Sequence, residues 1–146
     1  MALDKYNALF PKELNYQIDY AILNDVTTAL TQDNRYKSRF VIKTPKGMHL
    51  LLSKNISFIE AAGTFCKLID DNGTSHLISQ SITVLNESLN PKQFFRINRS
   101  QIVHINHIIR MENYFKNRLV LHMTGGKDKL ITSSSTTAKF RIWLDS

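Results

Sequence analysis

Turn signals divide residues 38–132 into short β-prone runs, and this spacing constrains the fold more than any other feature of the chain. Asn72-Gly73 is the strongest of these signals, because both residues tolerate positive φ in a tight hairpin. Four turns that contain glycine separate the β-prone runs, at residues 45–47, 62–64, 70–73 and 124–127. The pattern predicts a mainly β domain of short antiparallel strands.

The strands and the few helices of this domain follow from the positions of the turns. A helix is expected at 81–89, where Asn90-Pro91 ends it, and a final helix is expected after Ser133–Ser135, whose hydroxyls can cap its first turn. Strands are predicted at 38–44, 48–53, 56–61, 65–69, 74–79, 108–114, 118–123 and 129–132.

A lead-in of helical character precedes this domain. Residues 2–10 are expected to form one or two helical turns that end at Pro11. Between positions 16 and 31, apolar residues recur at every fourth position, as on one face of an amphipathic helix: Ile18, Ile22, Val26 and Leu30. We therefore predict a lead-in or linker at 1–37 and a single domain at 38–146.

The formal net charge of +7 comes entirely from the later part of the chain. Residues 1–37 hold four Lys/Arg against five Asp/Glu, whereas residues 38–146 hold fifteen against seven. Between Lys92 and Arg118, six cationic residues occur with only one carboxylate, that of Glu112. This asymmetry favours a polyanionic partner, and nucleic acid over a membrane surface, although basic surfaces also serve solubility alone.

The same composition gives expectations about location. No run is long and apolar enough to span a membrane, and Met1 leads into Asp4 and Lys5 rather than into a secretory signal. Cys66 is the only cysteine, which excludes an internal disulfide and suits a reducing cytoplasm. We expect a cytoplasmic protein with no membrane partner.

No set of residues has the spacing of a catalytic or metal site. His104 and His107 lie three residues apart, but a zinc site needs further ligands that the chain does not pair with them. The hydroxyls of 133–137 lack a glycine elbow, and Gly125-Gly126-Lys127 is a hairpin signal rather than a phosphate-binding loop. We expect no enzyme, no metal and no cofactor.

Residues 94–104, FFRINRSQIVH, intersperse arginines with aromatic and β-branched residues and contain no carboxylate. This pattern places cationic forks on a rigid frame, which suits both phosphates and base edges. Arg99 is expected to be the main base reader, flanked by Asn98 and Ser100, with Arg96 and Lys92 on phosphates.

A competing interpretation makes these arginines structural. In that interpretation, Arg96 or Arg99 forms an ion pair with Glu60 or Glu112 instead of contacting a ligand.

The order of landmarks over residues 38–144 resembles the LytTR family of bacterial transcription regulators. The most specific match is the signature Phe94-Phe95-Arg96-Ile97-x-Arg99-Ser100-x-Ile102-Val103. Further landmarks precede and follow it, namely the strand 39–43, Phe58 and Glu60 in 56–61, the strand 65–68, the helix 81–89, Asn106-His107-Ile108 and Phe140-x-x-Trp143-Leu144.

The resemblance implies an elongated β domain that reads neighbouring grooves of double-stranded DNA through loops. Its three contact regions correspond to residues 63–66, 98–100 and 133–135. The implied base readers are Arg99, Asn98, Thr64 and Ser135. The implied phosphate-binding residues are Lys92, Arg96, Lys67, Ser100, Ser134 and Lys139.

Two positions depart from the family pattern. The family commonly has His before the signature arginine, where this chain has Asn98, which is also able to read a base edge. The family often has Arg in the last loop, where this chain has Ser134 and Ser135. Lys127, Lys129 and Lys139 are expected to compensate for the missing charge.

The resemblance predicts sequence-specific binding of promoter DNA by the output domain of a two-component response regulator, acting in a phosphorelay. It implies an upstream receiver domain, or else a stand-alone regulator, and a homodimer on repeated sites. The alternative is a protein-interaction module whose basic face docks an acidic partner. Single-stranded RNA is a remote option, because Phe94 and Phe95 are adjacent and at most one of them can face a ligand from a strand.

Overall fold

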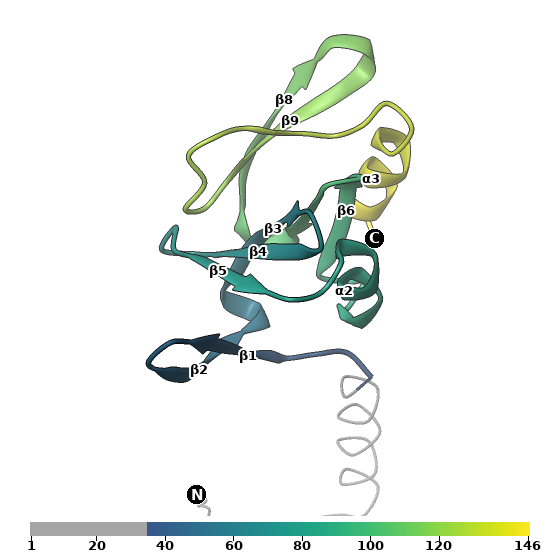
Figure 1. Cartoon of the computed structure of the whole chain (residues 1–146). Coiled ribbons are helices and arrows are strands. Elements are labelled where there is room, and N and C mark those ends of the chain that lie inside the picture. Colours follow the sequence, from purple (N-terminus) through teal and green to yellow (C-terminus); the bar gives the residue numbers. More distant parts are fainter. Residues whose placement is uncertain (1–34) are drawn as a thin grey trace, which may run out of the picture. The chain divides into compact units, whose positions relative to one another are not determined.

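The structure is a computed structural model that describes residues 35–146 (Figure 1). The helices expected at 2–10 and 16–31 lie outside the described residues, so the helical lead-in and the boundary near residue 37 stay predictions. The elements in chain order are β1 (Arg39–Thr44), β2 (Gly47–Leu52), η1 (Ser53–Asn55), β3 (Ile56–Ala62), β4 (Phe65–Asp70), β5 (Ser75–Ile78), α2 (Ile82–Ser88), β6 (Phe94–Asn98), β7 (Gln101–His104), η2 (Ile105–His107), β8 (Ile108–Tyr114), η3 (Phe115–Asn117), β9 (Arg118–Met123), β10 (Leu130–Ile131) and α3 (Thr137–Leu144).

The described strands form three antiparallel sheets. The first is the β1–β2 hairpin, the second has the order β5-β4-β3-β7-β6, and the third has the order β10-β9-β8. The mainly β fold expected from the turn pattern is confirmed, and most predicted strands lie within a residue or two of the observed bounds. The segment 94–104 proves to be two paired strands, β6 and β7, rather than one continuous element.

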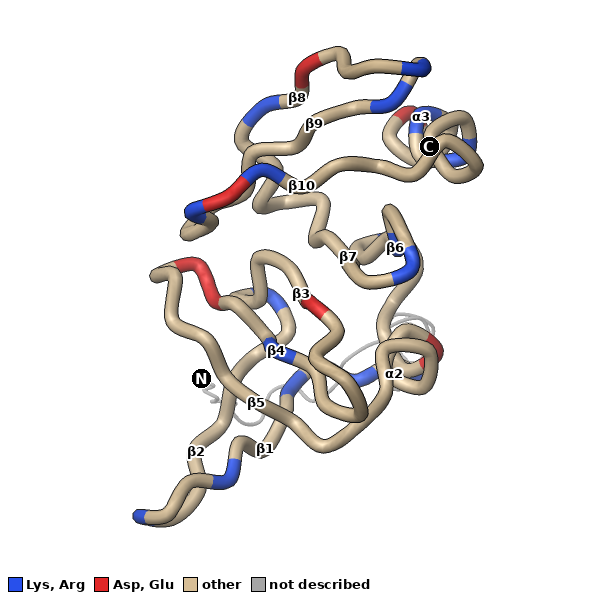
Figure 2. Tube along the Cα trace, turned by 45° about the horizontal axis from the view of Figure 1, so that its top comes forward, with Lys and Arg blue, Asp and Glu red and all other residues tan. Residues whose placement is uncertain are grey.

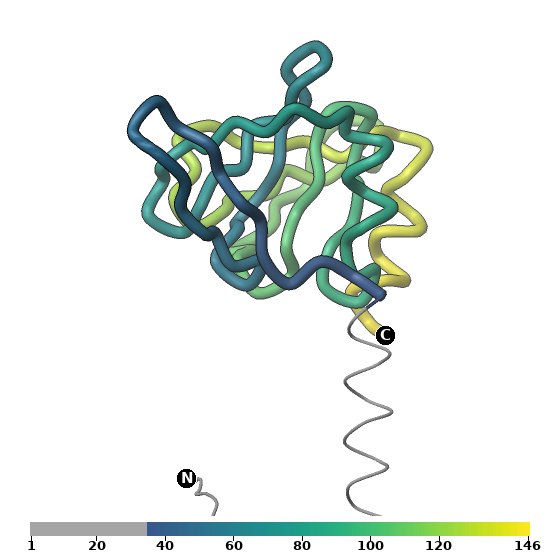
Figure 3. The backbone as a smooth tube through the Cα atoms, turned by 60° about the horizontal axis from the view of Figure 1, so that its bottom comes forward, coloured from purple at the N-terminus to yellow at the C-terminus, as the bar shows by residue number. Residues whose placement is uncertain are grey.

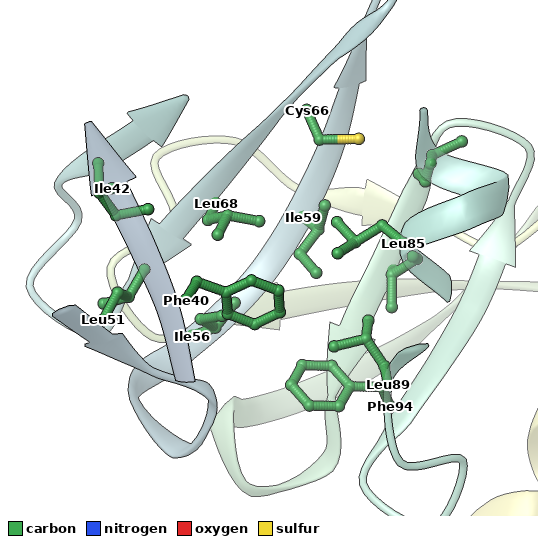
Figure 4. Close-up of a cluster of buried hydrophobic side chains, with 12 residues drawn as sticks. Phe40, Ile42, Leu51, Ile56, Ile59, Cys66, Leu68, Leu85, Leu89 and Phe94 are labelled. Carbon is green, nitrogen blue, oxygen red and sulfur yellow. The ribbon is translucent and has the colours of Figure 1, made fainter. Parts of the chain in front are cut away.

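The five-stranded sheet is covered on both faces. Neighbouring residues of each strand point to opposite sides, so the strands supply apolar side chains to a core on each face. On one face, Ile59 and Leu68 meet side chains of the β1–β2 hairpin and of α2, including Phe40, Leu51 and Leu85 (Figure 4). On the other face, a second cluster joins the sheet to the third sheet and to α3 through Phe58, Ile97, Val103, Leu121, Leu130 and Phe140. The central sheet is thus a rigid layer between two cores.

Two of the predicted glycine turns pack against each other. Gly125 has a φ of +72°, and a Cβ atom there would lie 2.7 Å from the Gly73 nitrogen and 2.8 Å from the Asp70 carbonyl oxygen. The turn after β4 and the turn after β9 can approach this closely only because both contain glycine. This contact fixes the third sheet against the central one.

One local expectation is wrong. The hydroxyls of Ser133–Ser135 do not cap α3, because its N-cap is Thr136 and makes no capping side-chain bond. The Thr136 hydroxyl instead donates to the Ile97 carbonyl oxygen at 2.6 Å. The Ser133 hydroxyl lies 2.7 Å from the Thr136 hydroxyl. These bonds join the loop before α3 to β6.

Candidate nucleic-acid interface

The residues between β6 and β7 form a tight turn that presents Arg99. Asn98 pairs with Gln101 across it, and we call Asn98–Gln101 the arginine turn. The Ser100 N–H donates to Asn98 Oδ1 at 2.8 Å, and the Ser100 carbonyl oxygen accepts the Ala61 N–H at 2.8 Å. The backbone of the turn is therefore held from within and from β3.

The Asn98 amide is occupied by the protein itself. Its Nδ2 donates to the Ile131 carbonyl oxygen at 2.8 Å and to Gln101 Oε1 at 3.0 Å. Gln101 in turn donates from Nε2 to Glu60 Oε2 at 2.9 Å. Because both donors and the acceptor of Asn98 are used, direct base reading by Asn98 would require these bonds to exchange.

Arg99 and Arg96 have different surroundings. Arg99 is exposed, and its side chain makes no hydrogen bond or ion pair with residues 35–146. The Arg96 guanidinium is half-buried and bonds to Thr83 and to the backbone of the arginine turn.

The ion-pair interpretation of these arginines is wrong for the described part of the chain. Among residues 35–146, neither Arg96 nor Arg99 pairs with a carboxylate, since Glu60 accepts from Gln101 and Glu112 contacts Arg110 and His122.

The second predicted contact region, residues 63–66, covers the β3–β4 turn and the start of β4. Gly63 adopts a φ of +65°, Thr64 is exposed, and the turn projects beyond its neighbours (Figure 3). The prediction is wrong for Cys66, which is fully buried and therefore cannot contact a ligand. Lys67 follows it and is exposed. Because Glu60 pairs with Gln101, the β3–β4 turn and the arginine turn lie at the same end of the sheet.

The third predicted region, residues 133–135, lies in the loop between β10 and α3. The Ser133 N–H donates to the Ile97 carbonyl oxygen at 2.9 Å, which places the loop beside the end of β6 and next to the arginine turn. Ser134 and Ser135 are exposed, as is Lys139 on the first turn of α3. The structure thus brings all three predicted regions together at one end of the central sheet.

Lys92 is not part of this cluster. It is exposed before the start of β6, whereas the arginine turn follows the end of that strand. Five residues of a strand span roughly 16 Å, so Lys92 lies well away from Arg99. The tube in Figure 2 shows cationic positions at the β6–β7 turn, along α3 and in the β8–β9 hairpin.

Several residues of this region were not foreseen from the sequence. Thr83 of α2 accepts from Arg96, Thr136 donates to Ile97, and Gln101 accepts from Asn98 within the arginine turn. No local signal marks Thr83 or Thr136, because their partners lie 13 and 39 residues away. The pairing of Gln101 with Glu60 follows from the register of β3 and β7, which the sequence alone does not give.

Two further observations bear on other kinds of site. Within residues 35–146, no three His, Cys, Asp or Glu side chains are grouped so as to hold a metal ion. No helix in this part of the chain is both long and apolar enough to cross a membrane.

Comparison with known proteins shows a family match and a similarity to solved structures. Residues 46–145 match the model of the family described as the LytTr DNA-binding domain. The chain is also similar in structure to a Bacillus cereus domain described as the LytTr DNA-binding domain of a methyl-accepting/DNA response regulator. The two share a TM-score of 0.67 and 24% sequence identity over 75% of this chain and 99% of that one.

Proposed function

Because this chain belongs to the LytTr DNA-binding domain family, we propose that it binds promoter DNA sequence-specifically and regulates transcription as the output domain of a response regulator. The observation that carries this proposal is the exposed Arg99 on a rigid turn, flanked by two further exposed loops at one end of the sheet. An arginine held in this way can donate two hydrogen bonds to the O6 and N7 atoms of a guanine.

The other base-reading roles fall to the two flanking loops. Thr64 and Ser135 each expose a hydroxyl, which can donate to or accept from a base edge. Asn98 supports reading through the backbone of the arginine turn, because its amide is already bonded there.

Phosphate contacts frame these readers and set the register on the duplex. Ser100 and Ser134 are exposed beside the base readers, and Lys67 and Lys139 supply charge next to the same loops. Lys92 lies further off and would contact a phosphate outside the central site.

The partners of the domain belong to the same proposal. Control by a phosphorelay would come from an upstream receiver domain, and two copies would bind a repeated site as a homodimer. A protein that acts on promoter DNA in a bacterium works in the cytoplasm. The competing hypothesis, docking of an acidic protein on the basic face, predicts only weak DNA association that ignores sequence and is lost at moderate salt.

The test compares Arg99→Ala with Lys46→Ala, which removes one cation from the β1–β2 turn instead. On a duplex enriched by selection, Arg99→Ala should lose about tenfold or more in affinity and relax the preference at one base pair, as expected for a bidentate arginine. Lys46→Ala should bind like the wild type. Equal affinities and preferences for the wild type and Arg99→Ala would remove Arg99 as a base reader.

A further inference from the structure

The proposed function assigns base reading to Arg99, and a neighbouring arginine controls how Arg99 is presented. We infer that Arg96 is a positioning residue: its guanidinium holds the backbone of the arginine turn and ties it to α2, instead of binding a phosphate of the DNA. This inference rests on the proposed function and replaces the phosphate role first expected for Arg96.

The hydrogen bonds of Arg96 are directed into the protein. Its Nη2 donates to the Arg99 carbonyl oxygen at 2.6 Å, and its Nη1 donates to the Thr83 hydroxyl at 3.2 Å. The Nε atom is buried and has no hydrogen-bond partner in the protein. A charged donor on a carbonyl oxygen makes one of the stronger hydrogen bonds found in proteins.

This arrangement leaves little of the guanidinium for a phosphate. An arginine binds an oxyanion with a pair of parallel N–H groups, either from Nε and one Nη or from both Nη atoms. Burial of Nε closes the first pair, and the bonds to Thr83 and the Arg99 carbonyl engage one N–H of each Nη, which leaves at most one N–H on each Nη for another acceptor. The Arg96 charge is also close to the buried Cys66 of β4: burial raises the pKa of this thiol, and Arg96 offsets part of that rise.

The bond from Arg96 to the Arg99 carbonyl oxygen, which we call the clamp, is the last of the bonds that hold the arginine turn. The Ser100 N–H is held by Asn98 and the Ser100 carbonyl by Ala61, so Arg96 supplies the remaining anchor at the Arg99 carbonyl. A turn fixed at each of these points presents the Arg99 side chain without ordering its backbone at the moment of binding. Loss of the clamp should therefore reduce binding through Arg99.

Lysine and glutamine at position 96 separate the two roles. Lysine keeps the positive charge and would preserve a phosphate contact, but a single ammonium on a flexible stem does not reproduce the planar fork between Thr83 and the Arg99 carbonyl. Glutamine removes the charge and would lower the salt dependence of binding by about one phosphate if Arg96 contacted DNA. A positioning role predicts that both variants behave alike.

The experiment is a double-mutant cycle between positions 96 and 99, measured by fluorescence anisotropy on a selected duplex and a scrambled control at several salt concentrations. We expect Arg96→Lys and Arg96→Gln each to lose roughly fivefold to tenfold on the selected duplex, with little loss on the scrambled one and an unchanged salt slope. Arg96→Gln combined with Arg99→Ala should bind about as well as Arg99→Ala alone.

Two other outcomes overturn the inference or its premise separately. If Arg96→Lys binds like the wild type, and Arg96→Gln weakens both duplexes equally with a salt slope smaller by about one, Arg96 is a phosphate ligand. If Arg99→Ala has no effect on either duplex, the proposed function itself fails at its main residue.

A second variant keeps the test decisive if the Arg96 variants unfold. Thr83 is exposed on α2, so Thr83→Val leaves both cores intact and removes only the acceptor of the Arg96 Nη1 bond. It should lose part of the preference for the selected duplex, and amide hydrogen exchange should quicken at Ser100. Wild-type preference and wild-type exchange in a folded Thr83→Val would overturn the inference.

Discussion

Acidification should destabilise the domain through one buried side chain, His104. This residue is 1% exposed, and its Nδ1 accepts the Asn106 N–H at 3.0 Å. The proton of the neutral ring therefore sits on Nε2, which is buried and has no hydrogen-bond partner in the protein. Burial, with a smaller contribution from the charge of His107, lowers the pKa of His104 from 6.5 to about 4.

The sign and size of the effect follow from that depressed pKa. Unfolded chains bind a proton at this histidine as the pH falls through about 6.5, whereas the folded domain binds it only near 4. Between those values the unfolded state holds more protons, so the free energy of unfolding falls with decreasing pH. A difference of about 2.5 pKa units corresponds to about 3 kcal/mol lost by pH 4, with no further loss from this group below it.

The assay is urea denaturation of the wild type and His104→Asn at a series of pH values from 7.5 to 4. Asparagine keeps an acceptor for the Asn106 N–H but does not titrate, and the loss of the ring contact with Phe94 should lower its stability at every pH. We expect the wild type to lose more stability than the variant between pH 6.5 and 4, by up to about 3 kcal/mol. Parallel pH curves for the two proteins would refute the assignment to His104.

Two stability predictions concern the packing of the sheets. Gly125→Ala should lower the free energy of unfolding, measured by urea denaturation, by roughly 1–3 kcal/mol, because its Cβ atom would lie 2.7 Å from the Gly73 nitrogen. Gly63→Ala is the control and should cost less, because Gly63 has a similar positive φ but open space around it. Phe140→Ala should lower the free energy of unfolding by about 3–5 kcal/mol, because the fully buried ring packs against Phe95 and Trp143. A thermal or urea unfolding curve no different from that of the wild type would show that α3 is not part of the core.

The strands were predictable because their signals are local. Asn72-Gly73 and the other glycine turns set the ends of the hairpins, and the β-prone runs at 108–114 and 118–123 match β8 and β9 residue for residue. The turn between β6 and β7 was not foreseen, because Arg99-Ser100 contains neither glycine nor proline and is held instead by Asn98, Ala61 and Arg96. Asn98 is a local turn signal, because its side chain accepts from the backbone two residues on, whereas the contributions of Ala61 and Arg96 depend on the strand register.

Side-chain contacts between different strands could not be predicted from the sequence either. His49 and His76 read as isolated strand residues, yet the ring nitrogens lie 3.3 Å apart and His76 also contacts Asp70 at 2.8 Å. The hydroxyls of Ser133–Ser135 were expected to cap α3, but its N-cap is Thr136, whose hydroxyl donates to the Ile97 carbonyl oxygen. In the candidate site, the exposure of Thr64, Arg99 and Ser134 was predictable, whereas the burial of Cys66 and the hydrogen-bond partners of Asn98 and Arg96 depended on the tertiary fold.

The most direct test of the account is selection of binding duplexes from a randomised pool, followed by a salt titration on the enriched duplex and a scrambled control. If about five phosphates are neutralised, the logarithm of the affinity should fall against the logarithm of salt concentration with a slope near −4.5. The account predicts an enriched motif that is bound far more tightly than the scrambled duplex at every salt concentration. No enrichment, with both duplexes released together as salt rises, would contradict sequence-specific recognition and leave only a basic surface.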